Sequence, residues 1–264
     1  MFGMKFEEIL IHRIRDFDAA FRASRKADLL YYVCLRQLAK ILGIQEKNII
    51  SLVKNNKLNL FGYQFLTRKE TLDFVFFSKF YEPETTAYMR SMKGNVLFDI
   101  GSHLGRFSII NSGNFKKIYS VEPQAENFQY LEKNIRLNKI KNIIPLNVAV
   151  SDREGKVNIS DLNINTGVVT ISEKGKETAA KTLDGLIKDF RIPIHDVNII
   201  KIDVEGHEIN VLKGAKNLLK KEAPIIVMES FAIEEVKNFL GKFGFTYRKT
   251  LDFYNHLFVK RRSN

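Results

Sequence analysis

The chain has 264 residues, of which 45% are hydrophobic and 27% charged, the balance of an ordinary globular protein. Its formal net charge is +12, an excess of Lys and Arg that is spread along the chain and fits either a solvated surface or an anionic partner. The single cysteine, Cys34, excludes an intramolecular disulfide framework and a cysteine-based zinc site, and no apolar run approaches the roughly 18 residues that cross a bilayer, so we expect a cytoplasmic protein without a transmembrane segment.

Residues 1–57 are predicted to form a helical extension in front of a larger domain over 58–264. Apolar residues recur there at three- and four-residue steps in two segments: Phe6, Leu10, Ile14, Phe17 and Phe21, then Leu30, Cys34, Leu38 and Ile41. Such stripes are typical of a helical cap or of a surface that forms a homo-oligomer. Peripheral contact with a membrane through a basic amphipathic helix is the alternative. Residues 58–80, which are aromatic and partly alternating, predict a hairpin that leads into the main domain.

From residue 94 onward, short apolar runs alternate with amphipathic helical patterns. The runs cover residues 95–100, 117–121, 143–150, 198–203 and 224–229. Continuous apolar strands separated by helices predict an α/β fold with a mostly parallel sheet that is covered on both faces. Residues 155–181 break the alternation and predict an inserted hairpin, and residues 245–251 and 256–260 predict an antiparallel pair at a sheet edge.

A turn that contains glycine follows the first of these strands, with the sequence DIGSHLG at 99–105. Glycine lets the backbone approach a ligand closely, and the helix that follows offers unpaired N–H groups. Glu122 ends the next strand, at the position where nucleotide-binding sheets hydrogen-bond a ribose. The combination indicates a ligand that contains adenosine, and a tight turn with an unrelated surface glutamate is the alternative.

The identity of that ligand follows from what the turn lacks. Its spacing matches neither the dinucleotide G-x-G-x-x-G pattern nor a phosphate-binding loop that ends in Gly-Lys-Ser/Thr. Asp99, which precedes the first glycine, would repel a phosphate and attract an ammonium or a sulfonium group. S-adenosylmethionine carries both groups, so it is the cofactor we expect.

A second dense motif, KIDVEGHE at 201–208, ends the fourth strand. Its titratable residues Asp203, Glu205 and His207 are the candidate catalytic residues. His207 is the natural general base by its ordinary pKa, and a carboxylate could take that role if burial raised its pKa. The alternatives are that His207 only begins a helix and that Glu205 caps one. Asp203 could also hold Mg²⁺ together with Glu229 at the end of the fifth strand, a further alternative to a site without metal.

With these motifs in this order, the chain resembles the FkbM family of S-adenosylmethionine-dependent methyltransferases. The resemblance runs from about residue 81 to 230 and rests on YEPET at 81–85, LFDIGSHLG at 97–105, SVEP at 120–123, NVAVSD at 147–152, TLDGL at 182–186, KIDVEGHE at 201–208, VLKGA at 211–215 and MES at 228–230. It implies a Rossmann-like class I methyltransferase fold, with a seven-stranded sheet whose last strand is antiparallel.

The resemblance also implies where the cofactor binds. The turn after the first strand would line its methionine end, Glu122 its ribose and residues 149–152 its adenine, while Asp203 would lie near the transferred methyl group. His103 stands where the family often has Asn and would reach the cofactor carboxylate. The full set expected to bind the cofactor is Asp99, Gly101, Ser102, His103, Gly105, Glu122, Pro123, Ala149, Val150 and Asp152.

The family resemblance suggests O-methylation of a hydroxyl on a sugar, a glycan precursor or another small molecule. An RNA methyltransferase is the alternative that the net charge of +12 favours. Against it, the chain lacks the Asn/Asp-Pro-Pro-Tyr/Phe motif of exocyclic-nitrogen methylation and a catalytic cysteine near the fourth to sixth strands. A third hypothesis is a binding module that retains the cofactor fold without catalysis.

Overall fold

The computed structural model of the chain describes residues 57–69, 71–79, 81–160, 167, 170–171 and 175–260. The predicted helices before Lys57, with Cys34, lie outside the described residues. The chain divides into two compact units, one of residues 1–81 with 163–166 and one of residues 82–162 with 167–264. The sequence places its domain boundary after residue 57, whereas this division groups the described residues up to Tyr81 with the N-terminal unit.

In the first unit, β1 (Lys57–Leu60) and β2 (Tyr63–Leu66) pair in an antiparallel hairpin, as predicted. The hairpin prediction is wrong for the following residues, because Asp73–Phe76 forms a short helix, α4. The buried carboxylate of Asp73 accepts hydrogen bonds from the backbone and the guanidinium of Arg68, at 2.8 to 3.0 Å. These bonds fix the turn before α4, and local sequence pattern does not reveal them.

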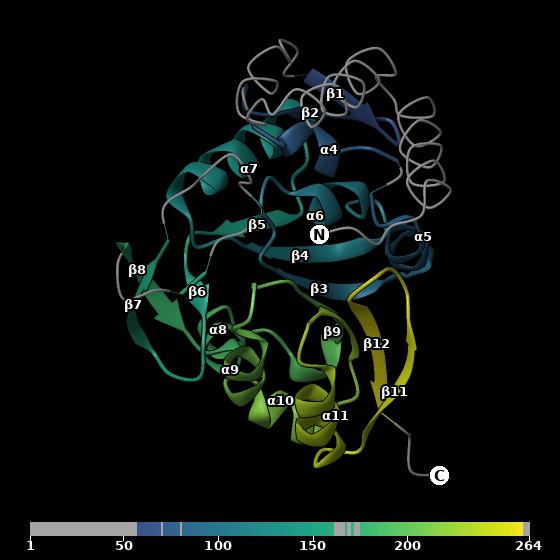
Figure 1. The fold of residues 1–264 in the computed structure, drawn as a ribbon, viewed down its shortest axis with the longest axis vertical. Helices are drawn as coiled ribbons and strands as arrows, with labels where there is room; N and C mark the ends of the chain where they lie inside the picture. Colours follow the sequence, from purple (N-terminus) through teal and green to yellow (C-terminus); the bar gives the residue numbers. More distant parts are fainter. Residues whose placement is uncertain are drawn as a thin grey trace, which may run out of the picture. The chain divides into compact units, whose positions relative to one another are not determined.

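The second unit is built on a seven-stranded sheet with the order β11-β12-β10-β9-β3-β4-β5 (Figure 1). The strands are β3 (Gly94–Ile100), β4 (Phe115–Val121), β5 (Ile143–Leu146), β9 (Val197–Ile202), β10 (Ile225–Glu229), β11 (Phe245–Thr250) and β12 (Asn255–Lys260). Strand β12 is antiparallel to both of its neighbours, whereas the pairs from β10 to β5 are parallel. The sheet confirms the expected α/β architecture with an antiparallel last strand.

Helices cover both faces of this sheet. In Figure 1, α5 (Pro83–Ser91), α6 (Arg106–Ile110) and α7 (Ala125–Leu137) lie on one side, and α8 (Leu183–Asp189), α9 (Glu208–Lys213), α10 (Lys216–Lys221) and α11 (Ile233–Gly241) lie on the other. A 3₁₀ turn, Ile194–Asp196, precedes β9. Along β3, Val96, Phe98 and Ile100 pack into the core under α8 to α11. Leu97 is also fully buried, which explains why the central strands read as continuous apolar runs.

The predicted strand over 143–150 is divided in two. Only β5 joins the main sheet, and β6 (Ala149–Val150) instead joins β7 (Gly155–Ile159) and β8 (Lys176–Lys181) in a sheet with the order β6-β8-β7. The Asn147 side chain explains the break, because it donates to the carbonyls of Glu122 and Pro123 at 2.8 and 3.1 Å and turns the chain after β5. The inserted hairpin over 155–181 is confirmed as β7 and β8.

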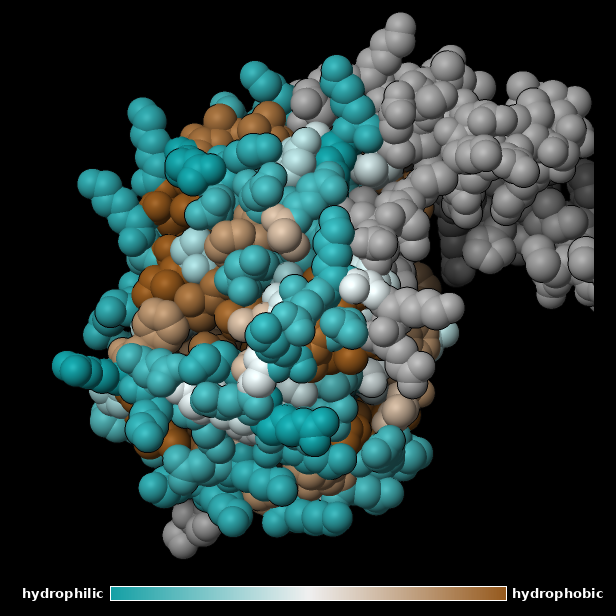
Figure 2. All heavy atoms as spheres, turned by 90° about the vertical axis from the view of Figure 1, so that its left-hand side faces the viewer, coloured by the Kyte–Doolittle hydropathy of each residue, from teal (hydrophilic) through white to brown (hydrophobic). Residues whose placement is uncertain are grey.

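The surface of the second unit shows no broad apolar face on the side of α7 and the small sheet. Figure 2 shows that hydrophilic side chains cover most of this side, with apolar ones scattered between them. Within the described ranges, no helix has both the length and the apolar character needed to cross a bilayer.

Candidate active site

The turn after β3 lies directly against the loop after β9, at the carboxyl end of the sheet, where the strand order changes direction. Gly101 has a φ of +81°, and a Cβ atom on it would lie 1.7 Å from the carbonyl oxygen of Asp203. The Asp203 N–H in turn donates to the Ile100 carbonyl at 2.9 Å. Only glycine fits this position, so the two motifs that the sequence singled out are joined there.

Glu122, at the end of β4, is buried and ties this strand to the same turn. Its carboxylate accepts hydrogen bonds from the backbone N–H of His103 at 2.8 Å and of Gln124 at 3.0 Å, and from the side chain of Asn127 at 3.2 Å. His103 has a φ of +50°, a strained value for a residue with a side chain. The residues predicted to bind the methionine and ribose parts of the cofactor are therefore close together.

A buried hydroxyl tests whether these residues fit S-adenosylmethionine. Ser102 is 5% exposed, and its Oγ has no hydrogen-bond partner among the described residues. A buried hydroxyl without a partner costs free energy, which a polar ligand atom would recover. Gly105, with a φ of +90°, completes the turn at the start of α6. The turn therefore offers the Ser102 hydroxyl as a donor where the cofactor's polar methionine end would bind.

The residues expected around the adenine lie on two connected segments. Ala149 and Val150 are buried in β6, and the exposed Asp152 follows them. Asn147 links this segment to Pro123 at the end of β4. Beyond Asp152 lies a hollow of about 230 Å³, which His207 also lines.

Asp99 belongs to a buried polar row rather than to the surface of the turn. Ser120, Asp99 and Lys201 are register neighbours on β4, β3 and β9. The hydroxyl of Ser108, on α6, donates to the Asp99 carboxylate at 2.5 Å and contacts the Ser120 hydroxyl at 2.8 Å. Burial raises the pKa of Asp99, although Ser108 and Lys201 act in the opposite direction. A direct contact of Asp99 with the cofactor stays a prediction.

Lys201 extends this row to the loop after β9. Its side chain is 1% exposed, and its Nζ donates to Asp203 Oδ2 at 2.9 Å and lies 5.0 Å from the centre of the Phe107 ring. Burial alone would lower the pKa of Lys201, but the surrounding carboxylates, Asp203 foremost, raise it above its ordinary value. Lys201 is therefore a permanent cation that orients Asp203.

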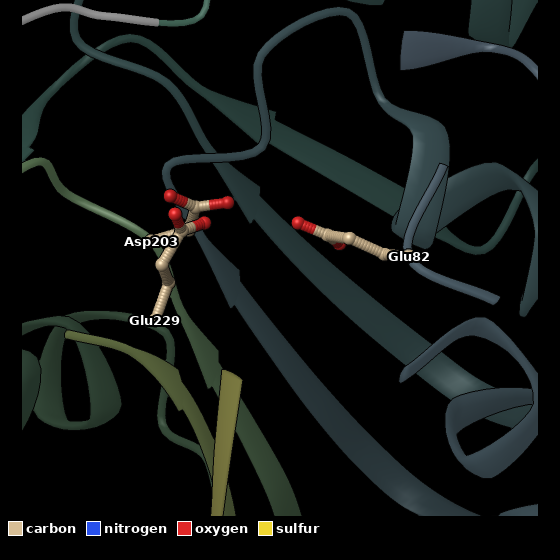
Figure 3. Close-up of side chains that lie close together, drawn as sticks. All are labelled: Glu82, Asp203 and Glu229. Atoms are coloured by element: carbon tan, nitrogen blue, oxygen red, sulfur yellow. The ribbon is translucent and has the colours of Figure 1, made fainter. Parts of the chain in front are cut away.

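Three carboxylates converge at this end of the sheet, and we call Glu82, Asp203 and Glu229 the carboxylate cluster (Figure 3). One oxygen from each lies within 4.8 Å of the other two. Asp203 follows β9, Glu229 ends β10, and Glu82 precedes α5 with a φ of +46°. Sequence reasoning missed Glu82, although it lies in the segment YEPET at 81–85 on which the family resemblance partly rests.

The helix that follows Glu82 is fixed by a residue from a distant part of the sequence. Asp252, in the turn before β12, accepts hydrogen bonds from the backbone N–H groups of Glu84 and Thr85 at 3.2 and 2.6 Å. Asp252 thus caps the start of α5, which has no cap from its own preceding residue. The Asn255 side chain, from the start of β12, acts to lower the pKa of Glu82, against the larger effect of burial.

The surroundings of the carboxylates at this end of the sheet disfavour their charged form. Burial raises the pKa of Glu229 to about 8 and that of Glu205 to about 7, and in both cases the charge of Asp203 adds to the effect while Lys201 opposes it. Burial likewise raises the pKa of Glu82. A positive charge placed beside these groups would favour their ionised form.

The three predicted catalytic residues are not equally placed. His207 is not part of the carboxylate cluster, and its two ring nitrogens contact the Ser151 hydroxyl at 2.9 Å and the Asn210 amide at 3.0 Å. Burial lowers its pKa, so it is neutral near pH 7. Glu205 has a φ of +50° in the turn before α9 and does not cap that helix, whose first turn follows His207. The catalytic roles of all three residues stay predictions.

Comparison with known families identifies the domain. The model of the family described as "Methyltransferase FkbM domain" matches residues 99–254, which is more than half of the chain. The chain belongs to the FkbM methyltransferase family. This membership confirms that the protein is an S-adenosylmethionine-dependent methyltransferase, as the family resemblance implies. It also confirms the cofactor that the turn after β3 and Glu122 predict.

Two curated proteins are similar to parts of this chain. Hexuronic acid methyltransferase AglP of Haloferax volcanii is 32% identical over 136 residues, which are 50% of this chain and 55% of AglP. The tRNA (guanine(37)-N(1))-methyltransferase Trm5b of Pyrococcus abyssi is 30% identical over 59 residues, which are 22% of this chain and 18% of Trm5b. The matches thus span about half of the first relative and less of the second.

Solved methyltransferase structures also align with this FkbM chain. The FkbM methyltransferase of Methylobacillus flagellatus KT is 14% identical, with a TM-score of 0.48, over 96% of this chain and 60% of that one. The Methanocaldococcus jannaschii Trm5 in complex with adenosine is 17% identical, with a TM-score of 0.48, over 81% of this chain and 63% of that one.

Proposed function

We propose that this protein is an O-methyltransferase that transfers a methyl group from S-adenosylmethionine to an oxygen of a sugar or glycan precursor. One observation carries the proposal: the carboxylate cluster adjoins the cofactor turn through the contact between Gly101 and Asp203. A donor site next to carboxylates suits an acceptor hydroxyl that has to lose a proton. The similarity to a hexuronic acid methyltransferase supports a sugar as the acceptor.

The residues that would hold the donor are the turn at Gly101–Gly105, Glu122 and the segment from Ala149 to Asp152. Glu122 would exchange part of its backbone contacts for the ribose hydroxyls, and Ser102 would gain its missing partner. When bound there, the donor would supply a methyl group on a positively charged sulfur, which is a good leaving group.

The chain's own task is to orient the acceptor oxygen and to remove its proton. Lys201 fixes the Asp203 carboxylate by an ion pair at 2.9 Å, so the acceptor meets a rigid group on this side. Glu229 faces it from the neighbouring strand (Figure 3). The hydroxyl proton passes to a carboxylate at this end of the sheet and from there to solvent, which leaves the oxygen free to take the methyl.

An exposed aromatic pair next to Glu229 suits a sugar ring. Phe231 and Tyr254 are 66% and 47% exposed, and their ring centres lie 4.2 Å apart. The Ser230 N–H donates to the Tyr254 carbonyl at 3.0 Å, so both rings flank the end of β10. An exposed apolar patch beside a polar site marks a binding surface, and a ring with one apolar face can pack on it.

Methyl transfer to a panel of saccharides, including hexuronic acids and nucleotide sugars, tests the proposal. We expect the Phe231→Ala and Tyr254→Ala variants to raise the KM for the acceptor, and Asp203→Asn to lower kcat. Leu137→Ala, on α7, removes a partly exposed apolar side chain elsewhere and is the matched control. Tight donor binding without transfer to any saccharide would contradict the proposal and favour a non-catalytic module.

RNA is the second candidate acceptor, because the chain carries a net charge of +12. The carboxylate cluster argues against it, since carboxylates repel the phosphates next to a target base. A tRNA affinity that falls steeply as salt rises would support this alternative, and a weak affinity that does not depend on salt would remove it.

A further inference from the structure

The carboxylate cluster has the dimensions of a metal site. Its three oxygens lie within 4.8 Å of one another (Figure 3). Around Mg²⁺, adjacent oxygen ligands lie about 3.0 Å apart and opposite ones about 4.2 Å apart. The three oxygens are therefore close enough to converge on one cation, which would draw them closer together.

Glu82 provides an independent indication that a ligand is missing. Its side chain is 6% exposed, and its Oε2 has no hydrogen-bond partner among the described residues. In Figure 3 this carboxylate points toward Asp203 and Glu229. Lys201 Nζ donates to Asp203 and forms no hydrogen bond with Glu82 Oε2. A buried carboxylate oxygen without a partner is costly, and its backbone is also strained at a φ of +46°.

The cluster brings three carboxylates together beside one cation that is already ion-paired. Lys201 Nζ pairs with Asp203 Oδ2 at 2.9 Å, and neither Glu82 nor Glu229 forms an ion pair within the described part of the chain. A divalent cation would compensate the two carboxylates that Lys201 leaves unpaired.

We propose that Glu82, Asp203 and Glu229 bind a hard divalent cation, Mg²⁺ or Mn²⁺, which in turn holds the methyl acceptor. Three carboxylates leave positions around an octahedral cation for two neighbouring acceptor oxygens. The cation lowers the pKa of a bound hydroxyl and lets an acidic site accept a polyhydroxylated or anionic ring. The role in catalysis rests on the proposed function, but cation binding itself does not.

Calorimetric titration of the full chain with Mn²⁺, after treatment with EDTA and dialysis, tests the site without any acceptor. We expect one Mn²⁺ per chain, displaced by Mg²⁺, and an affinity that falls at least about tenfold in Glu82→Gln and Glu229→Gln. Glu84→Gln is the matched control, because Glu84 is an exposed glutamate on the same helix. Affinity for S-adenosylhomocysteine should stay unchanged in Glu82→Gln, which also shows that this variant is folded.

The outcomes separate the two proposals. If wild-type protein binds no Mn²⁺, with or without S-adenosylhomocysteine, the metal site is wrong, whether or not saccharides are methylated in EDTA. If Mn²⁺ binds and depends on Glu82 and Glu229 while no saccharide is methylated, the metal site stands and the sugar acceptor is wrong. If Glu82→Gln fails to fold, Glu229→Gln decides the question with the same two measurements.

Discussion

Gly101 and Asp203 are in such close backbone contact that a side chain of one carbon on Gly101 would collide with the Asp203 carbonyl oxygen. The first residue begins the cofactor turn, and the second belongs to the carboxylate cluster. The distance between the turn after β3 and the loop after β9 is therefore fixed by main-chain packing rather than by side chains that can rotate. In the reaction we propose, a displacement of either loop would misalign the reacting groups.

Replacement of Gly101 by alanine should disrupt both sites at once. We expect Gly101→Ala to lower the free energy of unfolding by more than about 2 kcal/mol, because a positive φ and a steric clash act together. Gly62→Ala is the control, since Gly62 has a similar φ of +90° but nothing within 4 Å of the added carbon. Urea denaturation measures the loss in the free energy of unfolding for Gly101→Ala and for Gly62→Ala. Equal losses in the two variants would refute the role of the contact with Asp203.

Glu122 should prove to be important for both stability and donor binding. Glu122→Ala leaves the N–H groups of His103 and Gln124 without an acceptor, and we expect a loss of about 1–3 kcal/mol in the free energy of unfolding. Affinity for S-adenosylmethionine, measured by calorimetry, should fall at least tenfold. Glu126→Ala removes an exposed carboxylate at the start of α7 and should leave the affinity unchanged.

The pH dependence of the free energy of unfolding should show that His207 has a structural role. Burial lowers its pKa below 6.5, so the folded state binds fewer protons than the unfolded state. The stability contribution is complete above pH 6.5 and is lost as the pH falls through the lowered pKa. As the pH falls from 7 to 5, the free energy of unfolding of His207→Gln should therefore rise relative to that of the wild type. Denaturation curves recorded at each pH measure this difference. A large loss of kcat at pH 8 would instead make His207 the general base.

We expect Asp252 to influence cation binding by the carboxylate cluster indirectly, through its cap on α5. Asp252→Ala removes the cap of α5 and should lower the free energy of unfolding by about 1–2 kcal/mol. Because Glu82 directly precedes this helix, Mn²⁺ affinity should fall as well. Asp252→Asn retains one acceptor oxygen and should lose less in both measurements. An unchanged Mn²⁺ affinity in Asp252→Ala would show that Glu82 is positioned without this cap.

Most of the fold could be predicted because its central strands are buried on both faces and read as apolar runs. The exception is the run over 143–150, where the apolar pattern continues past Asn147 but the strand of the main sheet ends at Leu146. The break depends on hydrogen bonds from Asn147 to the carbonyls of Glu122 and Pro123, which only the folded sheet brings within reach. Local pattern carries no information on such a contact.

The candidate site was predictable where it is continuous in sequence. Glycine turns and acids at strand ends pointed to Gly101, Glu122 and Asp203. Glu82 was missed because it reaches Asp203 only through the tertiary structure. His207 seemed a natural companion of Asp203, but the turn at Glu205 and Gly206, both with positive φ, directs it toward Ser151 instead.

The cap that Asp252 provides also bears on how the protein is made. Its bonds to the start of α5 join residues that are 167 and 168 positions apart. Translation therefore completes the turn after β3 and the parallel strands up to Glu229 before Asp252 is made. The nascent chain can pair these strands early, but the helix that follows Glu82 gains its cap only after Asp252 has emerged.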